Sequence, residues 1–147
     1  MPQRYFLTED DFAQRQITSP DQHHTLRVMR MKTNDLVEVC FMKKCYLVKL
    51  AIHDQNINFE IDKPLKNKQS LDITLIQGLP KGNKIDIITK YATVYGVLTI
   101  LFTQMQRSIA KDKNSENKIK RLSLIAKEAA ELAHRSDVPK IRFMHAL

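Results

Sequence analysis

The chain has 147 residues, 43% of them hydrophobic and 27% charged, and this length suits one domain of average size or two small ones. No apolar run approaches the ~20 residues that span a bilayer, so we expect no membrane-spanning segment, and the composition argues against disorder and a coiled coil. Residues 1–4 lead into mixed polar sequence without a signal-peptide pattern. We therefore expect a cytoplasmic protein.

Positive charge is concentrated in the second half of the chain. The net charge is +8; residues 1–72 carry eleven Lys/Arg and ten Asp/Glu, whereas residues 73–147 carry thirteen and six. This asymmetry indicates a polyanionic partner, most often nucleic acid. From charge alone, a basic protein that is merely soluble is about as plausible.

Short strands dominate the predicted first half. Ser19 resembles an N-cap, with Pro at the first helical position and Gln three residues after the Ser, so we expect a short capped helix over about residues 20–31. Runs rich in β-branched and aromatic residues predict strands at 36–41, 45–52 and 57–61. Strands this closely spaced, with one helix near the start, indicate a small β-barrel.

The second half changes to alternating strands and helices after a polar linker at residues 63–70. The expected elements are, in order, a strand at 73–76, a helix at 83–95, a strand at 97–102, a helix starting at Ser115 and a strand at 140–143. This order predicts right-handed crossovers and a parallel α/β sheet. We expect domains at 1–70 and 71–147.

Helical periodicity predicts which side chains the two helices bury. The first helix should bury Ile85, Ile88, Ala92 and Tyr95 and end at Gly96. The second should bury Ile119, Leu122, Ile125, Ala129 and Leu132. The last strand is followed by no helix to cover it, so we expect another copy of the chain, or something outside it, to do so.

Two basic segments are candidate phosphate-binding sites. The loop Gly78–Lys84 joins a strand to a helix, where open α/β sheets bind ligands, and it carries Lys81 and Lys84. It matches neither common phosphate-loop pattern, so a plain turn has comparable weight. A second cluster favours phosphate binding, with a solvated surface as the usual alternative; its members are Arg107, Lys111, Lys113, Lys118, Lys120 and Arg121.

No residue set in the chain forms a recognisable metal site. The only cysteines, Cys40 and Cys45, have no second pair to complete a zinc site, and we expect two reduced, partly buried thiols. His23 and His24 are adjacent and do not share a helix face, so helix-end or core-edge histidines are expected.

The predicted second helix carries a group of residues that could be catalytic. Glu128, Glu131, His134 and Arg135 are spaced three and four apart and could form a catalytic face, although such spacing more often makes surface salt bridges. No Ser-His-Asp, Cys-His or HExxH arrangement is visible, so the catalytic residue stays unknown.

Several motifs occur together in an order that resembles the bacterial RsmE family. They are Gln-Arg-Tyr-Phe at 3–6, His-His-Thr-Leu-Arg-Val-Met-Arg-Met-Lys at 23–32, Gln-Gly-Leu-Pro-Lys-Gly-Asn-Lys at 77–84, Gly96-Val97, Arg107-Ser108 and Lys-Glu-Ala-Ala-Glu at 127–131. RsmE proteins are small-subunit rRNA uridine N3-methyltransferases of the SPOUT class. The resemblance implies an N-terminal PUA-like β-barrel that holds RNA, the first half of a SPOUT-type parallel α/β domain, S-adenosylmethionine as cofactor, and a homodimer.

The chain also departs from the family pattern. Val94, Gln106 and Leu132 stand where the family usually has Glu, Glu and Gln, and Cys-Phe-Met at 40–42 stands where a strand usually ends in Phe-Asp-Gly. The Gly-Pro-Glu-Gly-Gly segment and the knotted stretch that hold the cofactor in the family have no counterpart before Leu147. We therefore assign no cofactor-binding residue in this chain.

By resemblance, the expected function is methyl transfer from S-adenosylmethionine to N3 of a uridine in small-subunit rRNA. The alternative is a non-catalytic RNA-binding protein, either a truncated or decayed relative or a part of a longer enzyme. A third possibility, a nucleotide-binding α/β enzyme unrelated to RNA, would need a phosphate-binding loop that this sequence does not supply. Phosphate contacts, which fix register rather than read sequence, are expected from Arg27, Arg30, Lys81, Lys84, Arg107, Lys120, Arg121 and Arg135.

Overall fold

The computed structural model describes residues 2–67, 71–104 and 115–144. The chain divides into two compact units, Met1–Lys68 and Gln69–Leu147, which we call unit 1 and unit 2. The division falls within the segment 63–70 that the sequence marks as a linker.

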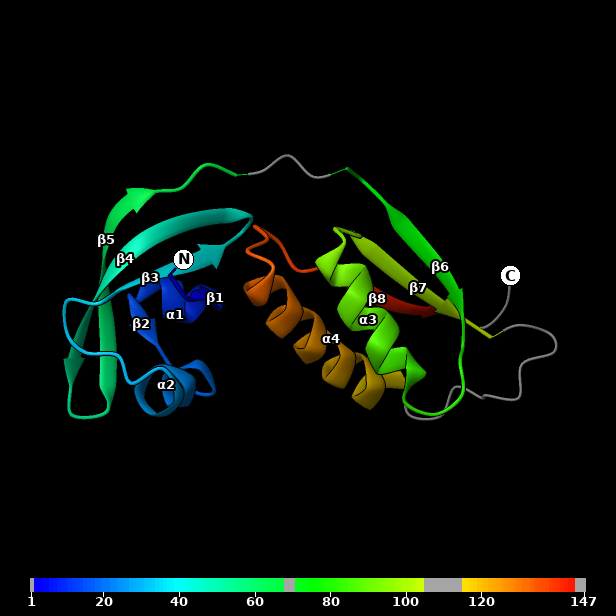
Figure 1. Ribbon diagram of the computed structural model, residues 1–147, viewed down its shortest axis with the longest axis horizontal. Helices are drawn as coiled ribbons and strands as arrows, with labels where there is room; N and C mark the ends of the chain where they lie inside the picture. Colours follow the sequence, from blue (N-terminus) through cyan, green and yellow to red (C-terminus); the bar gives the residue numbers. More distant parts are fainter. Residues whose placement is uncertain (1, 68–70, 105–114, 145–147) are drawn as a thin grey trace. The chain divides into compact units, whose positions relative to one another are not determined.

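A curled, mixed five-stranded sheet forms most of unit 1 (Figure 1). Its strands are β1 (Arg4–Phe6), β2 (Gln16–Ile17), β3 (Leu36–Phe41), β4 (Lys44–His53) and β5 (Asn56–Pro64), in the order β1-β3-β4-β5-β2. Only the β1–β3 pair is parallel. The three predicted strands are confirmed as the centre of a half-barrel, whereas β1 and β2 are too short to give a periodic signal.

The helical part of unit 1 is shorter than predicted and partly irregular. The α2 helix (Asp21–His23) continues directly into a π-helix, η1 (His24–Val28), in which the Met29 N–H donates to the His24 carbonyl at 2.9 Å. The predicted capping box is absent, because the Ser19 hydroxyl donates to the side-chain oxygen of Gln22 at 3.4 Å and makes no backbone cap. A further short helix, α1 (Glu9–Ala13), was not predicted.

The core of unit 1 lies against the curled sheet. Its buried members include Tyr5, Val37, Val39, Val48 and Leu50, which come from alternating positions on three strands. Beside this core, the side chains of Arg4 and Glu38 are about one-tenth exposed and form an ion pair, with Nε and Nη2 of Arg4 at 2.7 and 2.6 Å from Oε2 of Glu38.

The expectation of two reduced thiols is wrong, because Cys40 and Cys45 form a disulfide. The β3–β4 register places the two residues directly opposite each other, with their Cα atoms 4.1 Å apart. Five residues of sequence separation do not reveal this pairing, since it depends on where the hairpin turns.

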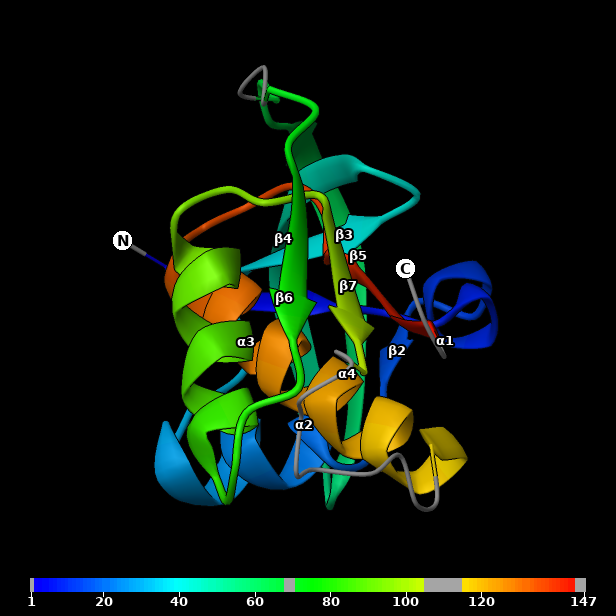
Figure 2. The same ribbon diagram turned by 90° about the vertical axis from the view of Figure 1, so that its right-hand side faces the viewer.

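Unit 2 contains a parallel three-stranded sheet covered by helices on one face. Its strands are β6 (Thr74–Gly78), β7 (Thr99–Thr103) and β8 (Lys140–Met144), in that order, and the helices are α3 (Lys84–Val94) and α4 (Ser115–Leu132). Both helices lie on the same side of the sheet (Figures 1 and 2), as expected when two successive crossovers run in the same direction with the same hand. The predicted strand-helix-strand-helix-strand order is confirmed.

The end of α3 follows the sequence prediction closely. Gly96 has φ +97°, its N–H donates to the Thr93 carbonyl, and the Val97 N–H donates to the Ala92 carbonyl. These two bonds form a Schellman motif, which requires a left-handed residue at Gly96 and therefore favours glycine.

The predicted helix faces are confirmed in their central residues and wrong at their last ones; Ile88 and Ile125 are partly buried against the core, and Ile119 is partly exposed. On α3, Ile85 and Ala92 are buried, but Tyr95 is 80% exposed because the chain leaves the helix there. On α4, Leu122 and Ala129 are buried, whereas Leu132, the final helical residue, is 72% exposed. Periodicity does not account for these ends, since the chain turns away from the core.

Within the three described ranges, no helix combines the length and apolar character that crossing a bilayer requires.

Candidate RNA interface

The basic residues singled out from the sequence fall into two groups, one in each unit. Arg27 and Arg30 belong to unit 1, at and just after η1, and both are exposed. Arg30 has φ +51°, a left-handed conformation that is uncommon for a residue with a β-carbon. Lys81, Lys84, Lys120 and Arg121 belong to unit 2 and are also exposed. Arg107, Lys111 and Lys113 lie outside the described residues.

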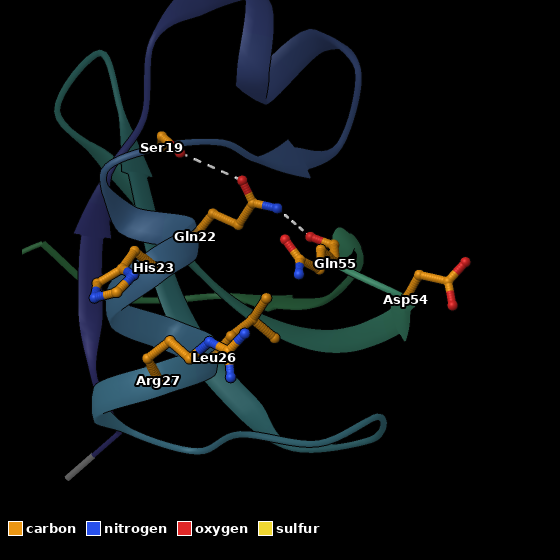
Figure 3. A pocket seen from close by; sticks show the side chains of 7 residues that line it. All are labelled: Ser19, Gln22, His23, Leu26, Arg27, Asp54 and Gln55. Carbon is orange, nitrogen blue, oxygen red and sulfur yellow. Dashed lines mark hydrogen bonds between the residues drawn. The ribbon is translucent and has the colours of Figure 1, made fainter.

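A pocket of about 600 Å³ lies beside Arg27 in unit 1. It opens between the α2–η1 segment and the turn that joins β4 to β5 (Figure 3). Its lining residues are Ser19, Gln22, His23, Leu26, Arg27, Asp54 and Gln55. Sequence reasoning found Arg27 and His23 but missed the turn residues, because only folding brings residues 54 and 55 next to the helix.

The two adjacent histidines have different environments. His24 is half-buried, and its Nδ1 lies 2.9 Å from the hydroxyl of the buried Tyr5, at hydrogen-bond distance. His23 is exposed and lines the pocket. The expectation of a core-edge histidine therefore holds for His24, and among the described residues there is no cluster of three or more metal-binding side chains.

The loop after β6 presents two exposed lysines at the carboxyl end of the parallel sheet. Lys81 lies in this loop and Lys84 is the first residue of α3. The loop is anchored by the Leu79 N–H, which donates to the Thr103 carbonyl at 2.9 Å. Backbone N–H groups at a helix start together with ammonium groups favour an anion, so the arrangement is compatible with a phosphate contact.

Arg121 on α4 already has an anionic partner. Its Nη1 lies 2.6 Å and 2.5 Å from the two carboxylate oxygens of Asp86 on α3, and half of the Arg121 side chain remains exposed. Lys120 beside it is exposed. Because Asp86 partly neutralises Arg121, Lys120 offers the stronger attraction to a polyanion.

The predicted phosphate contact at Arg135 is wrong, because this side chain is used within unit 2. Its Nη1 donates to the carbonyls of Thr93 and Val97, both at 2.9 Å, and its Nη2 donates to Asp137 at 2.8 Å. Only 9% of the side chain is exposed. The guanidinium thus donates to carbonyl groups at the carboxyl end of α3, where the helix dipole favours a cation.

The acidic residues of α4 fit a structural role better than a catalytic one. Glu131 is buried, and one of its oxygens lies 3.7 Å from Nζ of Lys127, one helical turn earlier. Glu128 is exposed. The i,i+4 salt bridge matches the alternative that the sequence left open: it includes Glu131, and its cation is Lys127.

The carboxyl edge of the parallel sheet is where a cofactor such as S-adenosylmethionine would be expected to lie. Gly78, Thr103 and Met144 share one register there, and the buried Thr103 hydroxyl has no hydrogen-bond partner among the described residues. A buried hydroxyl normally has a partner, so this atom could accept one from a ligand. One hydroxyl does not hold an adenosyl sulfonium, and the described residues therefore do not fit this cofactor.

Comparisons with known proteins agree with this fold. A model of the RNA methyltransferase domain matches residues 67–147. The ribosomal RNA small subunit methyltransferase E of Bacillus subtilis is 33% identical over 98% of this chain and 60% of its own length. The protein of the same name from Buchnera aphidicola is 33% identical over 91% of this chain and 56% of its own length.

A solved structure shows the same fold at lower identity. It is the ribosomal RNA small subunit methyltransferase E of Neisseria gonorrhoeae bound to S-adenosyl methionine, with a TM-score of 0.80 and 22% identity over 97% of this chain and 63% of that one. This chain thus spans about 60% of the length of the curated relatives it matches. Because the domain model covers more than half of the chain, and the motifs, the fold and the relatives all agree, the chain belongs to the RsmE family of RNA methyltransferases.

Proposed function

We propose that this protein acts in the methylation of small-subunit rRNA, at N3 of a uridine, with S-adenosylmethionine as methyl donor of the complete enzyme. The observation that carries the proposal is the 33% identity to the Bacillus subtilis relative over 98% of this chain. In this proposal, unit 1 holds RNA and unit 2 is the first half of the methyltransferase domain. The protein then works in the cytoplasm, where ribosomes are assembled.

The chain's own contribution is to bind and orient the RNA. Positioning a nucleotide is a large part of catalysis when two reactants must meet in line. The proposed phosphate contacts are Arg27, Arg30, Lys81, Lys84, Arg107, Lys120 and Arg121; six of these are exposed, and Arg107 rests on the sequence alone. Phosphate contacts of this kind fix the register of the RNA without reading its sequence.

Deleting the gene tests the proposal directly. A methyl group on N3 blocks the pairing edge of uridine, so reverse transcription of the rRNA stops at the modified position. We expect the stop to disappear from the small-subunit rRNA of the deletion strain and to return when the intact gene is restored. A stop that persists after deletion contradicts the methylation proposal.

The second candidate function is RNA binding without catalysis. It is favoured by the poor fit of the described residues to the cofactor and by Val94, which stands where the family usually has Glu. A persistent stop in the deletion strain, together with tight rRNA binding by the purified chain, would support this second function.

We also propose that the protein is a homodimer. On α3 the side chains of Ile87, Tyr91 and Val94 lie on one helical face, Tyr95 follows at the C-cap, and the four are 42–80% exposed. A contiguous apolar stripe on a soluble protein marks an interaction surface. The β8 strand, at the edge of the sheet in the described residues, is a further surface for pairing.

A further inference from the structure

The pocket between the α2–η1 segment and the β4–β5 turn has a lining that suggests a ligand. About 600 Å³ falls within the usual range for small-molecule sites. Two of its lining residues, His23 and Arg27, are one turn apart on the same helical segment and can both donate to an anion. The pocket therefore combines one cation, Arg27, and a second possible hydrogen-bond donor, His23, with room for more than an ion.

The guanidinium of Arg27 is available for binding. Arg27 is exposed and, in the described part of the chain, it makes no ion pair or side-chain hydrogen bond. Asp54, the one acid in the lining, directs its carboxylate away from the helix in Figure 3. An anion at Arg27 thus meets little repulsion from Asp54.

The opposite wall is held in place by hydrogen bonds. The Gln22 side chain accepts a hydrogen bond from the Ser19 hydroxyl and donates one to the backbone carbonyl of Gln55. These bonds tie the helix to the β4–β5 turn (Figure 3). The Gln55 side-chain amide makes no hydrogen bond to another described residue, so it has donors and an acceptor to offer. Leu26 contributes an apolar surface and packs against the core.

Uncommon backbone conformations surround the pocket. Five residues, His24–Val28, adopt a π-helix, a conformation that is rare and often found at functional sites. Asp54 in the facing turn and Arg30 after the helix have φ values of +56° and +51°. Sparsely populated conformations of this kind cluster at binding sites.

We propose that this pocket binds one unpaired nucleotide of the RNA. The phosphate lies at Arg27 and His23, the base packs on Leu26, and the Gln55 amide hydrogen-bonds to the base edge. Splayed single-stranded bases are the usual target of RNA recognition through apolar contacts and edge hydrogen bonds. This inference rests on the proposed RNA substrate and adds the nucleotide-binding element in unit 1.

The test measures binding of a fluorescent single-stranded RNA oligonucleotide to the full chain by anisotropy. Arg27→Gln should weaken binding about tenfold, the effect of losing one charge-assisted contact of about 1.4 kcal/mol. The control is Lys49→Gln, which removes one charge from an exposed residue of β4 outside the pocket and should weaken binding less than about twofold.

A second variant and a second probe distinguish contacts to the base from contacts to the phosphate. Gln55→Ala should weaken binding of the oligonucleotide but leave binding of inorganic polyphosphate unchanged, since polyphosphate has no base. Uridine monophosphate tests whether a free nucleotide competes. Equal losses for Arg27→Gln and Lys49→Gln overturn the pocket proposal while RNA binding stands. If the wild-type chain does not bind RNA at all, the proposed RNA function fails instead.

Discussion

The half-barrel of unit 1 and the parallel sheet of unit 2 differ in what they leave exposed. In unit 1 the polar groups near the core are paired, as in Arg4–Glu38, and a disulfide closes the β3–β4 hairpin. Of the exposed large hydrophobic residues among those described, four lie in unit 1 and ten in unit 2. Unit 1 thus exposes less apolar surface than unit 2, whose exposed hydrophobic side chains another protein surface should cover.

Positive charge, like exposed apolar surface, is greater in the second half of the chain. The second half of the chain carries almost all of the net positive charge, yet the pocket lies in the nearly neutral first half. We therefore expect unit 2 to attract RNA over long range and unit 1 to recognise a nucleotide locally.

Cofactor binding should show the largest effect. We expect calorimetric titration of this chain with S-adenosylmethionine to give no saturable heat, because at the described edge of unit 2 the Thr103 hydroxyl is the one buried side-chain group without a hydrogen-bond partner. The Bacillus subtilis relative serves as the control. A micromolar dissociation constant, about −8 kcal/mol, would contradict this prediction and place a cofactor site in the chain.

The ion pair of unit 1 should matter strongly for stability. Glu38→Ala removes the carboxylate that pairs with the buried Arg4 guanidinium and should lower the free energy of unfolding by about 3–5 kcal/mol in urea titrations. Replacing both residues, as Arg4→Met with Glu38→Leu, should recover most of that loss. A loss of under about 1 kcal/mol in the single variant would mean that water already solvates the pair.

Packing should control the stability of unit 2. Leu122→Ala removes a fully buried side chain of α4 and should cost about 2–5 kcal/mol. Leu124→Ala, two residues away and 46% exposed, is the matched control and should change stability by less than about 0.5 kcal/mol. Similar losses in both variants would show that the outer face of α4 is covered in solution.

Self-association tests the uncovered face of α3. We expect a dimer in sedimentation velocity, and Tyr91→Glu should weaken it at least tenfold, because a charge would be buried in an apolar interface. Lys90→Glu changes the neighbouring residue on α3 and serves as the control. A wild-type chain that sediments as a monomer at all concentrations rules out the dimer.

The smallest effect should be the salt dependence of RNA binding. Each neutralised phosphate contributes about −0.7 to −0.9 to the slope of log K against log salt, so Lys120→Gln should flatten the slope by about that amount. Arg121→Gln should flatten it less, because Asp86 already pairs with Arg121. An unchanged slope in Lys120→Gln would identify the α4 cluster as a solvated surface.

Local sequence patterns were sufficient for the long strands of unit 1 and for the strand-helix order of unit 2. Strand composition correctly predicted the three long strands of the half-barrel, and the position of Gly96 correctly predicted the end of α3, because both depend on residues close in the chain. The motifs at residues 77–84 and 127–131 were also enough to predict the family that the comparisons confirm.

Tertiary structure decided everything that depends on pairing between distant residues. The Cys40–Cys45 bond follows from the register of a hairpin, and the loss of Arg135 as a phosphate contact follows from two carbonyls about forty residues earlier in the sequence. The pocket forms only where residues 54 and 55 meet a π-helical turn. Periodicity reports which face of an element is apolar, but a side chain's partner depends on the long-range register that folding establishes.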